Sequence, residues 1–143
     1  MKRILLIVAT MSLLFSAQSW AVSIDGCYQM YTRGGGVYPS FCIKGSAEEG
    51  IAGAGTQVAI MGPNSNNVIW CAKTIKVEAG EAGEMVLKFN EKIDSIKLGV
   101  LSEKNEGQVV ISEGSKGQPL DYMKISKDAS GPLADVFESP LCQ

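Results

Sequence analysis

Hydrophobic residues occur along this chain in short runs, and segments rich in glycine or asparagine separate these runs. Short runs bounded by turn-forming residues, at spacings of about 8–12 residues, are typical of β-sandwiches and up-and-down barrels. No stretch shows a sustained helical period. The pattern predicts an all-β domain of about eight short, mainly antiparallel strands in a small barrel or a sandwich. The expected strands cover residues 27–32, 37–43, 56–61, 68–77, 85–89, 96–101, 108–112 and 120–126.

Local features refine this prediction. Pro39 cannot donate a hydrogen bond to a neighbouring strand, so the second run is expected to be an edge strand or to contain a bulge. In the fourth run, strict alternation places Cys71 and Val77 on the same face of the sheet. After Pro132, residues 133–137 are expected to form a single helical turn before an irregular tail.

The N-terminal segment has the organisation of a secretory signal peptide. Two basic residues follow Met1, a short apolar run comes next, and small side chains at Ser19 and Ala21 suit cleavage after Ala21. The apolar run is shorter than the ~20 residues that cross a bilayer, which argues against the alternative of a membrane anchor. We therefore expect a signal peptide at residues 1–21 and a single secreted β domain at residues 22–143.

The cysteine content favours a disulfide-bonded domain. The chain has four cysteines and no histidine, and no two cysteines form a C-x-x-C pair. An even number of cysteines in an exported protein indicates disulfides. The alternative, a zinc site, normally uses closely spaced ligand pairs and often histidine. We expect two disulfides among Cys27, Cys42, Cys71 and Cys142.

The glycines at 34–36 favour one pairing of these cysteines. If the first two of them form a two-residue hairpin turn, Cys27 lies directly opposite Cys42. Residues opposed in this way are close enough to approach disulfide geometry, which leaves Cys71 to pair with Cys142. A turn shifted by one residue removes the match, and a bond from Cys27 to Cys142 is the alternative.

The charge of the chain argues against two classes of partner. Of the 13 basic residues, two lie in the signal peptide, which leaves 11 against 15 acidic residues, and Arg33 is the only arginine among them. Nucleic acids and anionic membrane surfaces both require clustered lysine and arginine. We therefore expect neither nucleic acid nor a stable membrane anchor, and the expected partner is an unidentified extracellular or envelope ligand.

The residue types limit the possible catalytic chemistry. Without histidine there is no Ser-His-Asp triad, no Cys-His pair and no imidazole ligand for a metal. We expect no metal and no cofactor. Glycosidase-type chemistry needs only two carboxylates, and the sequence offers pairs such as Glu48 with Glu49 or Glu81 with Glu84. Their position in glycine-rich turns favours a simpler role as solubilising surface charge.

Aromatic side chains are the candidate ligand-binding residues. Aromatic rings stack on sugars and close over apolar pockets, but alternate aromatics also fill β-sheet cores. Arg33, beside three glycines, is a further candidate as the tip of a projecting protease-binding loop, although a charged residue beside a turn needs no such role. The aromatic candidates are Tyr28, Tyr31, Tyr38, Trp70 and Tyr122.

Export, crosslinks and the lack of common catalytic groups together favour a non-enzymatic binding module, secreted or periplasmic. Its ligand is expected to be a protein, a glycan or a small apolar molecule. The alternatives are a secreted hydrolase that works through carboxylates alone, and a structural protein of the envelope or matrix.

Overall fold

The computed structural model describes residues 24–45, 53–125 and 132–143, and the predicted signal peptide lies outside these residues. The described chain is all-β, as predicted, with short helical turns at Glu81–Gly83 (η1), Pro132–Phe137 (α1) and Pro140–Cys142 (η2). The helical turn expected after Pro132 is therefore confirmed. The strands are β1 (Gly26–Tyr31), β2 (Val37–Lys44), β3 (Gln57–Met61), β4 (Val68–Lys73), β5 (Lys76–Ala79), β6 (Met85–Lys88), β7 (Ser95–Leu98), β8 (Glu106–Glu113) and β9 (Lys116–Lys124).

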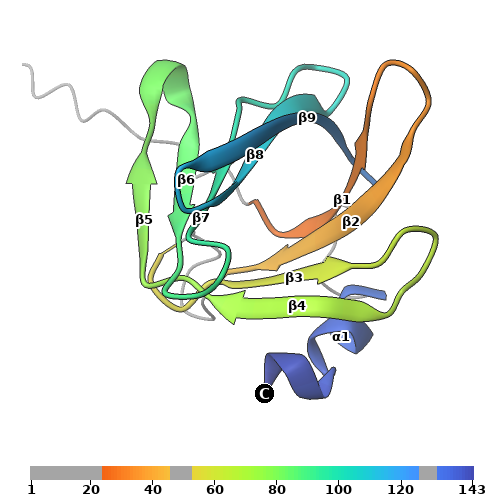
Figure 1. Cartoon of the computed structure of the whole chain (residues 1–143), viewed down its shortest axis with the longest axis vertical. Coiled ribbons are helices and arrows are strands. Elements are labelled where there is room, and N and C mark those ends of the chain that lie inside the picture. The colour runs from red at the N-terminus through yellow and green to blue at the C-terminus, as the bar shows by residue number, and fades with distance from the viewer. Residues whose placement is uncertain (1–23, 46–52, 126–131) are drawn as a thin grey trace, which may run out of the picture.

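These nine strands form one antiparallel sheet, in the order β4-β3-β2-β1-β9-β8-β7-β6-β5. Neighbours in the sheet are neighbours in sequence, except that β9 returns to pair with β1. The sheet curls into a half-barrel, with β1–β4 along one side, β5–β7 along another, and the β8–β9 hairpin crossing between them (Figure 1). Of the two predicted arrangements, the structure is the barrel-like one.

The fourth predicted strand is two strands, because the chain turns a corner at Thr74. The Thr74 N–H donates to the Thr56 carbonyl at 2.8 Å, which continues the pairing with the β3 side. The next residue, Ile75, instead donates to the Lys88 carbonyl beside β6 at 2.9 Å. The corner reverses the alternation, so Val77 packs on the interior whereas Cys71 packs on the outer face. The prediction that these two residues share a face was wrong.

The hairpin of β1 and β2 has the predicted register but a different turn. Cys27 lies opposite Cys42, as expected. The turn is closed by a hydrogen bond of 2.9 Å from Gly35 N–H to the Thr32 carbonyl, and the register shifts between the turn and Cys42. Pro39 lies in this shifted part of β2. Since β2 pairs on both sides, with β1 and β3, the proline marks a bulge and not an edge strand.

The interior of the half-barrel is apolar, and alternate residues of nearly every strand point into it. Three aromatic rings pack at its centre: Tyr28 stacks on Phe41 with ring centroids 4.9 Å apart, and Tyr122 meets Tyr28 edge-on at 5.5 Å. Such ring pairs add stability beyond their buried area. The buried interior consists of Ile24, Tyr28, Met30, Phe41, Ile43, Val58, Ile60, Leu87, Phe89, Ile93, Ile96, Leu98, Val109, Leu120 and Tyr122.

The C-terminal tail covers the outer face of β1–β4 (Figure 1). Val136 and Phe137 of α1 pack there against the opposite side of the strands from the aromatic rings. Both predicted disulfides are confirmed and both lie on this outer face: Cys27–Cys42 joins β1 to β2, and Cys71–Cys142 ties the tail to β4. Strands β2 and β3 are therefore buried on both faces.

Candidate functional site

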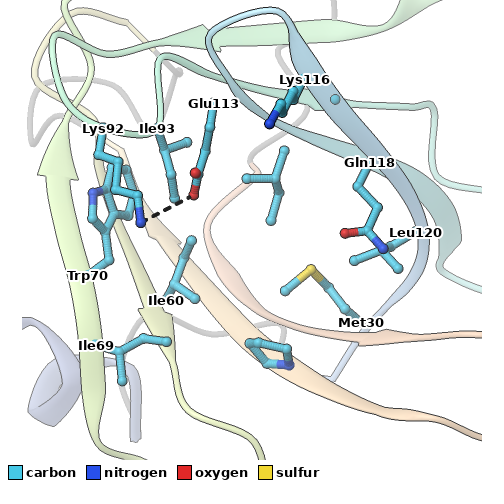
Figure 2. A pocket seen from close by; sticks show the side chains of 13 residues that line it. Met30, Ile60, Ile69, Trp70, Lys92, Ile93, Glu113, Lys116, Gln118 and Leu120 are labelled. Atoms are coloured by element: carbon cyan, nitrogen blue, oxygen red, sulfur yellow. Dashed lines mark ion pairs between the residues drawn. The ribbon is translucent and has the colours of Figure 1, made fainter.

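The interior is not completely filled. A pocket of about 620 Å³ lies inside the half-barrel, at the end where β8 turns into β9. It is bounded on one side by β1–β4 and on the other by the β8–β9 hairpin, and Lys92 and Ile93 close it from the loop between β6 and β7 (Figure 2). Ligand sites typically have volumes of about 300–1,000 Å³ and mainly apolar walls, so this pocket is the candidate functional site.

The walls of the pocket are apolar because each contributing strand continues the alternation that builds the core. Met30 follows buried Tyr28 by two positions in β1, and Leu120 precedes buried Tyr122 by two positions in β9. The same spacing relates buried Val58 to Ile60 in β3 and buried Val109 to Ile111 in β8. The apolar lining consists of Met30, Pro39, Ile60, Ile69, Trp70, Ile93, Ile111 and Leu120.

A bulge in β4 brings one more apolar side chain to the pocket. Met61 pairs with Val68 and Ile60 pairs with Trp70, so Ile69 is an extra residue without a partner in β3. Figure 2 shows its side chain directed toward the hollow. Ile69 is 58% exposed and lines the pocket, so the bulge places an apolar group at its mouth.

Trp70 is held in a fixed orientation at the pocket wall. Its ring meets Phe89 edge-on, with centroids 5.2 Å apart and planes at 80°. Phe89 belongs to the buried interior, so the contact anchors the indole to the core. The indole therefore forms a firm wall against which a bound molecule can pack.

The mouth of the pocket is polar. The Lys92 ammonium nitrogen lies 3.8 Å from a carboxylate oxygen of Glu113, and this ion pair bridges the β6–β7 loop and the end of β8. Lys116 and Gln118, both on β9, point their polar ends toward the hollow (Figure 2). The site thus combines an apolar interior with charged and amide groups at its rim.

Two of the predicted ligand-binding tyrosines lie in the core. Tyr28 and Tyr122 are each 1% exposed. The Tyr28 hydroxyl donates to the Ile24 carbonyl, and the Tyr122 hydroxyl donates to the Gly99 carbonyl at 2.7 Å. Burial raises the pKa of the Tyr122 hydroxyl to about 12, and burial, with a smaller contribution from Tyr122, raises the pKa of Tyr28 further above its usual range. Both residues therefore serve as structural members of the interior.

Tyr31 and Arg33 lie away from the pocket, near β9. The Arg33 guanidinium is exposed and lies 3.7 Å from a carboxylate oxygen of Asp121. Desolvation, followed by the neighbouring Glu106 and Asp121 carboxylates, raises the pKa of Tyr31, while Arg33 acts in the opposite direction. The side chain of Tyr38 lies outside the described part of the structure. Of the predicted ligand-binding residues, Trp70 lines the pocket.

The candidate carboxylates are placed as surface charges where the structure describes them. Glu81 is exposed in η1, and Glu84 lies 3.4 Å from the ammonium nitrogen of Lys97. Glu48 and Glu49 lie outside the described residues. Within the described ranges, no group of three or more acidic or cysteine residues has an arrangement that would hold a metal ion. No helix in the described part of the chain is long and apolar enough to cross a membrane.

Sequence reasoning did not identify the other lining residues. The same inward alternation applies to core residues and to the lining residues Met30, Ile60, Ile111 and Leu120. The sequence pattern alone therefore does not distinguish a residue that lines a pocket from one that fills the core. The polar rim had no signal in the sequence, because lysine and glutamate beside a turn are normally solvated.

The chain matches no family model, no curated protein and no solved structure.

Proposed function

We propose that this protein is an exported, non-enzymatic binding protein that takes up a small apolar molecule in the pocket between β1–β4 and the β8–β9 hairpin. The observation that carries the proposal is the hollow itself, about 620 Å³ in volume and walled mainly by aliphatic side chains and Trp70. A fold that packs three aromatic rings tightly at its centre leaves this space open beside them. Export is proposed from the signal-like N-terminus, and the two disulfides agree with an oxidising compartment.

The physical driving force for binding is the replacement of water by an apolar ligand. About twenty water molecules at liquid density would fill a volume of this size, and most of the wall offers them no hydrogen bonds. Removing apolar surface from water contributes about 25 cal/mol per Å². A ligand that covers the walls therefore gains free energy from its own surface and from the pocket surface.

The alternative of carboxylate-dependent hydrolysis requires two acidic side chains in one cleft. Among the described residues that line the pocket, Glu113 is the acidic one, and it is paired with Lys92. The binding proposal is therefore the one that this geometry supports best.

Titration of the purified, disulfide-bonded protein with N-phenyl-1-naphthylamine, a neutral apolar fluorophore, tests the proposal. We expect saturable binding with one site per chain and a blue shift of the emission. Ile69 and Ile75 offer a matched pair of variants, since their side chains are 58% and 59% exposed and only Ile69 lines the pocket. Loss of the apolar contact in Ile69→Asn is expected to weaken binding about fivefold, and Ile75→Asn is expected to bind normally.

Two outcomes would contradict the proposal. The first is non-saturable or absent binding by a protein that melts cooperatively. The second is equal weakening by Ile69→Asn and Ile75→Asn, which would locate the fluorophore on the general apolar surface and not in the pocket.

A further inference from the structure

The rim of the pocket has an excess of positive charge. Among the described lining residues, two ammonium groups, Lys92 and Lys116, face one carboxylate, Glu113. A carboxylate oxygen of Glu113 lies 3.8 Å from the Lys92 ammonium nitrogen, and Lys116 has no ion pair among the described residues. Lys116 is the cross-strand partner of Glu113 at the end of the β8–β9 hairpin, so both lysines share the influence of a single negative charge.

The uncompensated ammonium of Lys116 is directed over the hollow. Figure 2 shows the Lys116 nitrogen turned toward the pocket and the Gln118 amide turned inward from the next wall position of β9. An ammonium group donates hydrogen bonds and accepts none, and a side-chain amide adds two further donors. The amide also has an acceptor oxygen, so it is the Lys116 ammonium that selects an acceptor here, and a negatively charged acceptor forms the stronger bonds.

The other end of the pocket excludes charge. Met30, Ile60 and Leu120 lie below the rim and are each at most 9% exposed, with no charged side chain among them. A charged group at that depth would be desolvated without a partner, which is costly. The pocket is therefore polarised, with one apolar end and one end suited to an anion.

We propose, on the basis of the binding function proposed above, that the ligand is an amphipathic carboxylate. Its hydrocarbon body lies along Met30, Ile60, Trp70 and Leu120, and its single carboxylate meets Lys116 and Gln118 at the mouth. The Lys92–Glu113 ion pair lies beside them at the rim, where the Lys92 ammonium offsets the charge of the Glu113 carboxylate.

Three probes with the same ten-carbon chain separate the contribution of the head group from that of the chain. Decanoate is anionic, decanol is neutral and decyltrimethylammonium is cationic, and each is measured below its micellar concentration by displacement of N-phenyl-1-naphthylamine. We expect decanoate to bind about fivefold more tightly than decanol, a size in keeping with a partly exposed ion pair. Decyltrimethylammonium is expected to bind most weakly.

Variants at the rim assign the preference to particular side chains. Lys116→Gln is expected to remove the preference for decanoate and to leave decanol binding unchanged. Glu113→Gln releases Lys92 and is expected to strengthen decanoate binding about threefold. The matched control is Lys104→Gln, since Lys104 is an exposed lysine in the turn that precedes β8, at the other end of that strand. This control is expected to bind all three probes as the parent protein does.

The outcomes show whether the amphipathic-carboxylate proposal fails alone or together with the proposed binding function. If the three decyl probes bind equally, or if Lys116→Gln and Lys104→Gln behave alike, the amphipathic-carboxylate proposal is overturned while the apolar binding function stands. Preference for decyltrimethylammonium would also overturn it and would assign the head-group site to Glu113. If no probe displaces the fluorophore because the fluorophore itself does not bind, both proposals fail.

Discussion

The interior of this half-barrel has two regions built from the same strands, one filled and one hollow. In β1, Tyr28 belongs to the filled region and Met30, two residues later, lines the hollow. In β9, Tyr122 is in the filled region and Leu120 lines the hollow. Three aromatic rings pack in the filled region, whereas mainly aliphatic side chains, together with Trp70, wall the hollow. The same alternation therefore places aromatic rings in one region and mainly aliphatic side chains around the other.

The two walls of the hollow differ in what lies behind them. The strands that carry Tyr28 and Phe41 are covered on their outer face by α1 and by both disulfides. The β8–β9 hairpin, which forms the far wall of the hollow, has exposed residues from Glu113 to Pro119. One side of the pocket is therefore a wall that is packed on both faces and crosslinked, while the opposite wall is exposed to solvent.

Removal of the support behind the covered wall is the change expected to have the largest effect. In the chain-entropy relation a disulfide that closes a 71-residue separation contributes about 4 kcal/mol and one that closes 15 residues about 3 kcal/mol. The double variant Cys71→Ala/Cys142→Ala is expected to lose more unfolding free energy than Cys27→Ala/Cys42→Ala, because it also releases Val136 and Phe137 from the outer face. Urea unfolding of both variants measures the difference. Equal losses would show that the tail does not support this wall.

Ile96 and Ile111 compare the two regions directly, because they are cross-strand partners in β7 and β8. Ile96 is 0% exposed in the filled region, and Ile111 lines the hollow. Truncation of a fully buried isoleucine leaves a cavity and costs about 3 kcal/mol. We expect that loss for Ile96→Ala and about 1 kcal/mol for Ile111→Ala, since Ile111 already borders open space. Similar losses from the two variants would contradict the assignment of Ile111 to a hollow.

Gly107 tests how tightly the filled region is packed. A Cβ atom at this position would come within 2.7 Å of the Tyr122 ring and of its hydroxyl. Gly107→Ala is therefore expected to displace the ring and to destabilise the protein by about 2 kcal/mol. Gly34→Ala is the matched control, because the atom nearest to its added Cβ is 3.9 Å away. Thermal melting of the two variants provides the measurement, and an unchanged melting temperature for Gly107→Ala would show that the region is loosely packed.

The pH dependence of stability is a smaller effect that reports on the same ring. Burial raises the pKa of Tyr122 from 10.0 to about 12 in the folded protein. Stabilisation by the protonated hydroxyl is therefore complete below pH 10 and is lost as the pH rises toward 12. The loss from this residue is expected to be about 1 kcal/mol at pH 11. Tyr122→Phe should flatten the decline in chemical unfolding experiments between pH 9 and 11, and a decline as steep as that of the parent protein would contradict the assignment.

Much of the architecture could be predicted from the sequence, because strand runs and turn residues are local signals. The pairing of Cys27 with Cys42 followed from the register of one hairpin, although the turn is centred differently and a bulge near Pro39 restores the register. The corner at Thr74 could not be predicted, because no glycine or proline marks it between the two strands.

The candidate site was much less predictable than the fold. Trp70 was identified as an aromatic with a possible role in binding, but Tyr28 and Tyr122 of the same residue class fill the core. Alternation determines which side chains point inward, whereas the empty space depends on how far apart opposing strands lie. That distance depends on the curl of the whole sheet, which no local pattern records. The sequence does not mark Lys116 and Gln118 as candidates, because their position over the hollow depends on where the folded hairpin lies.

The most direct test of the central claim is a two-dimensional NMR titration of isoleucine-methyl-labelled protein with decanol. We expect the methyl resonances of the lining residues Ile60, Ile69, Ile93 and Ile111 to shift together and to saturate at one equivalent. The resonances of Ile43, Ile75 and Ile96, which do not line the pocket, are expected to stay in place. Shifts centred on Ile75, or no saturable shift at any of the lining residues, would contradict the claim that the hollow end of the half-barrel is a binding site.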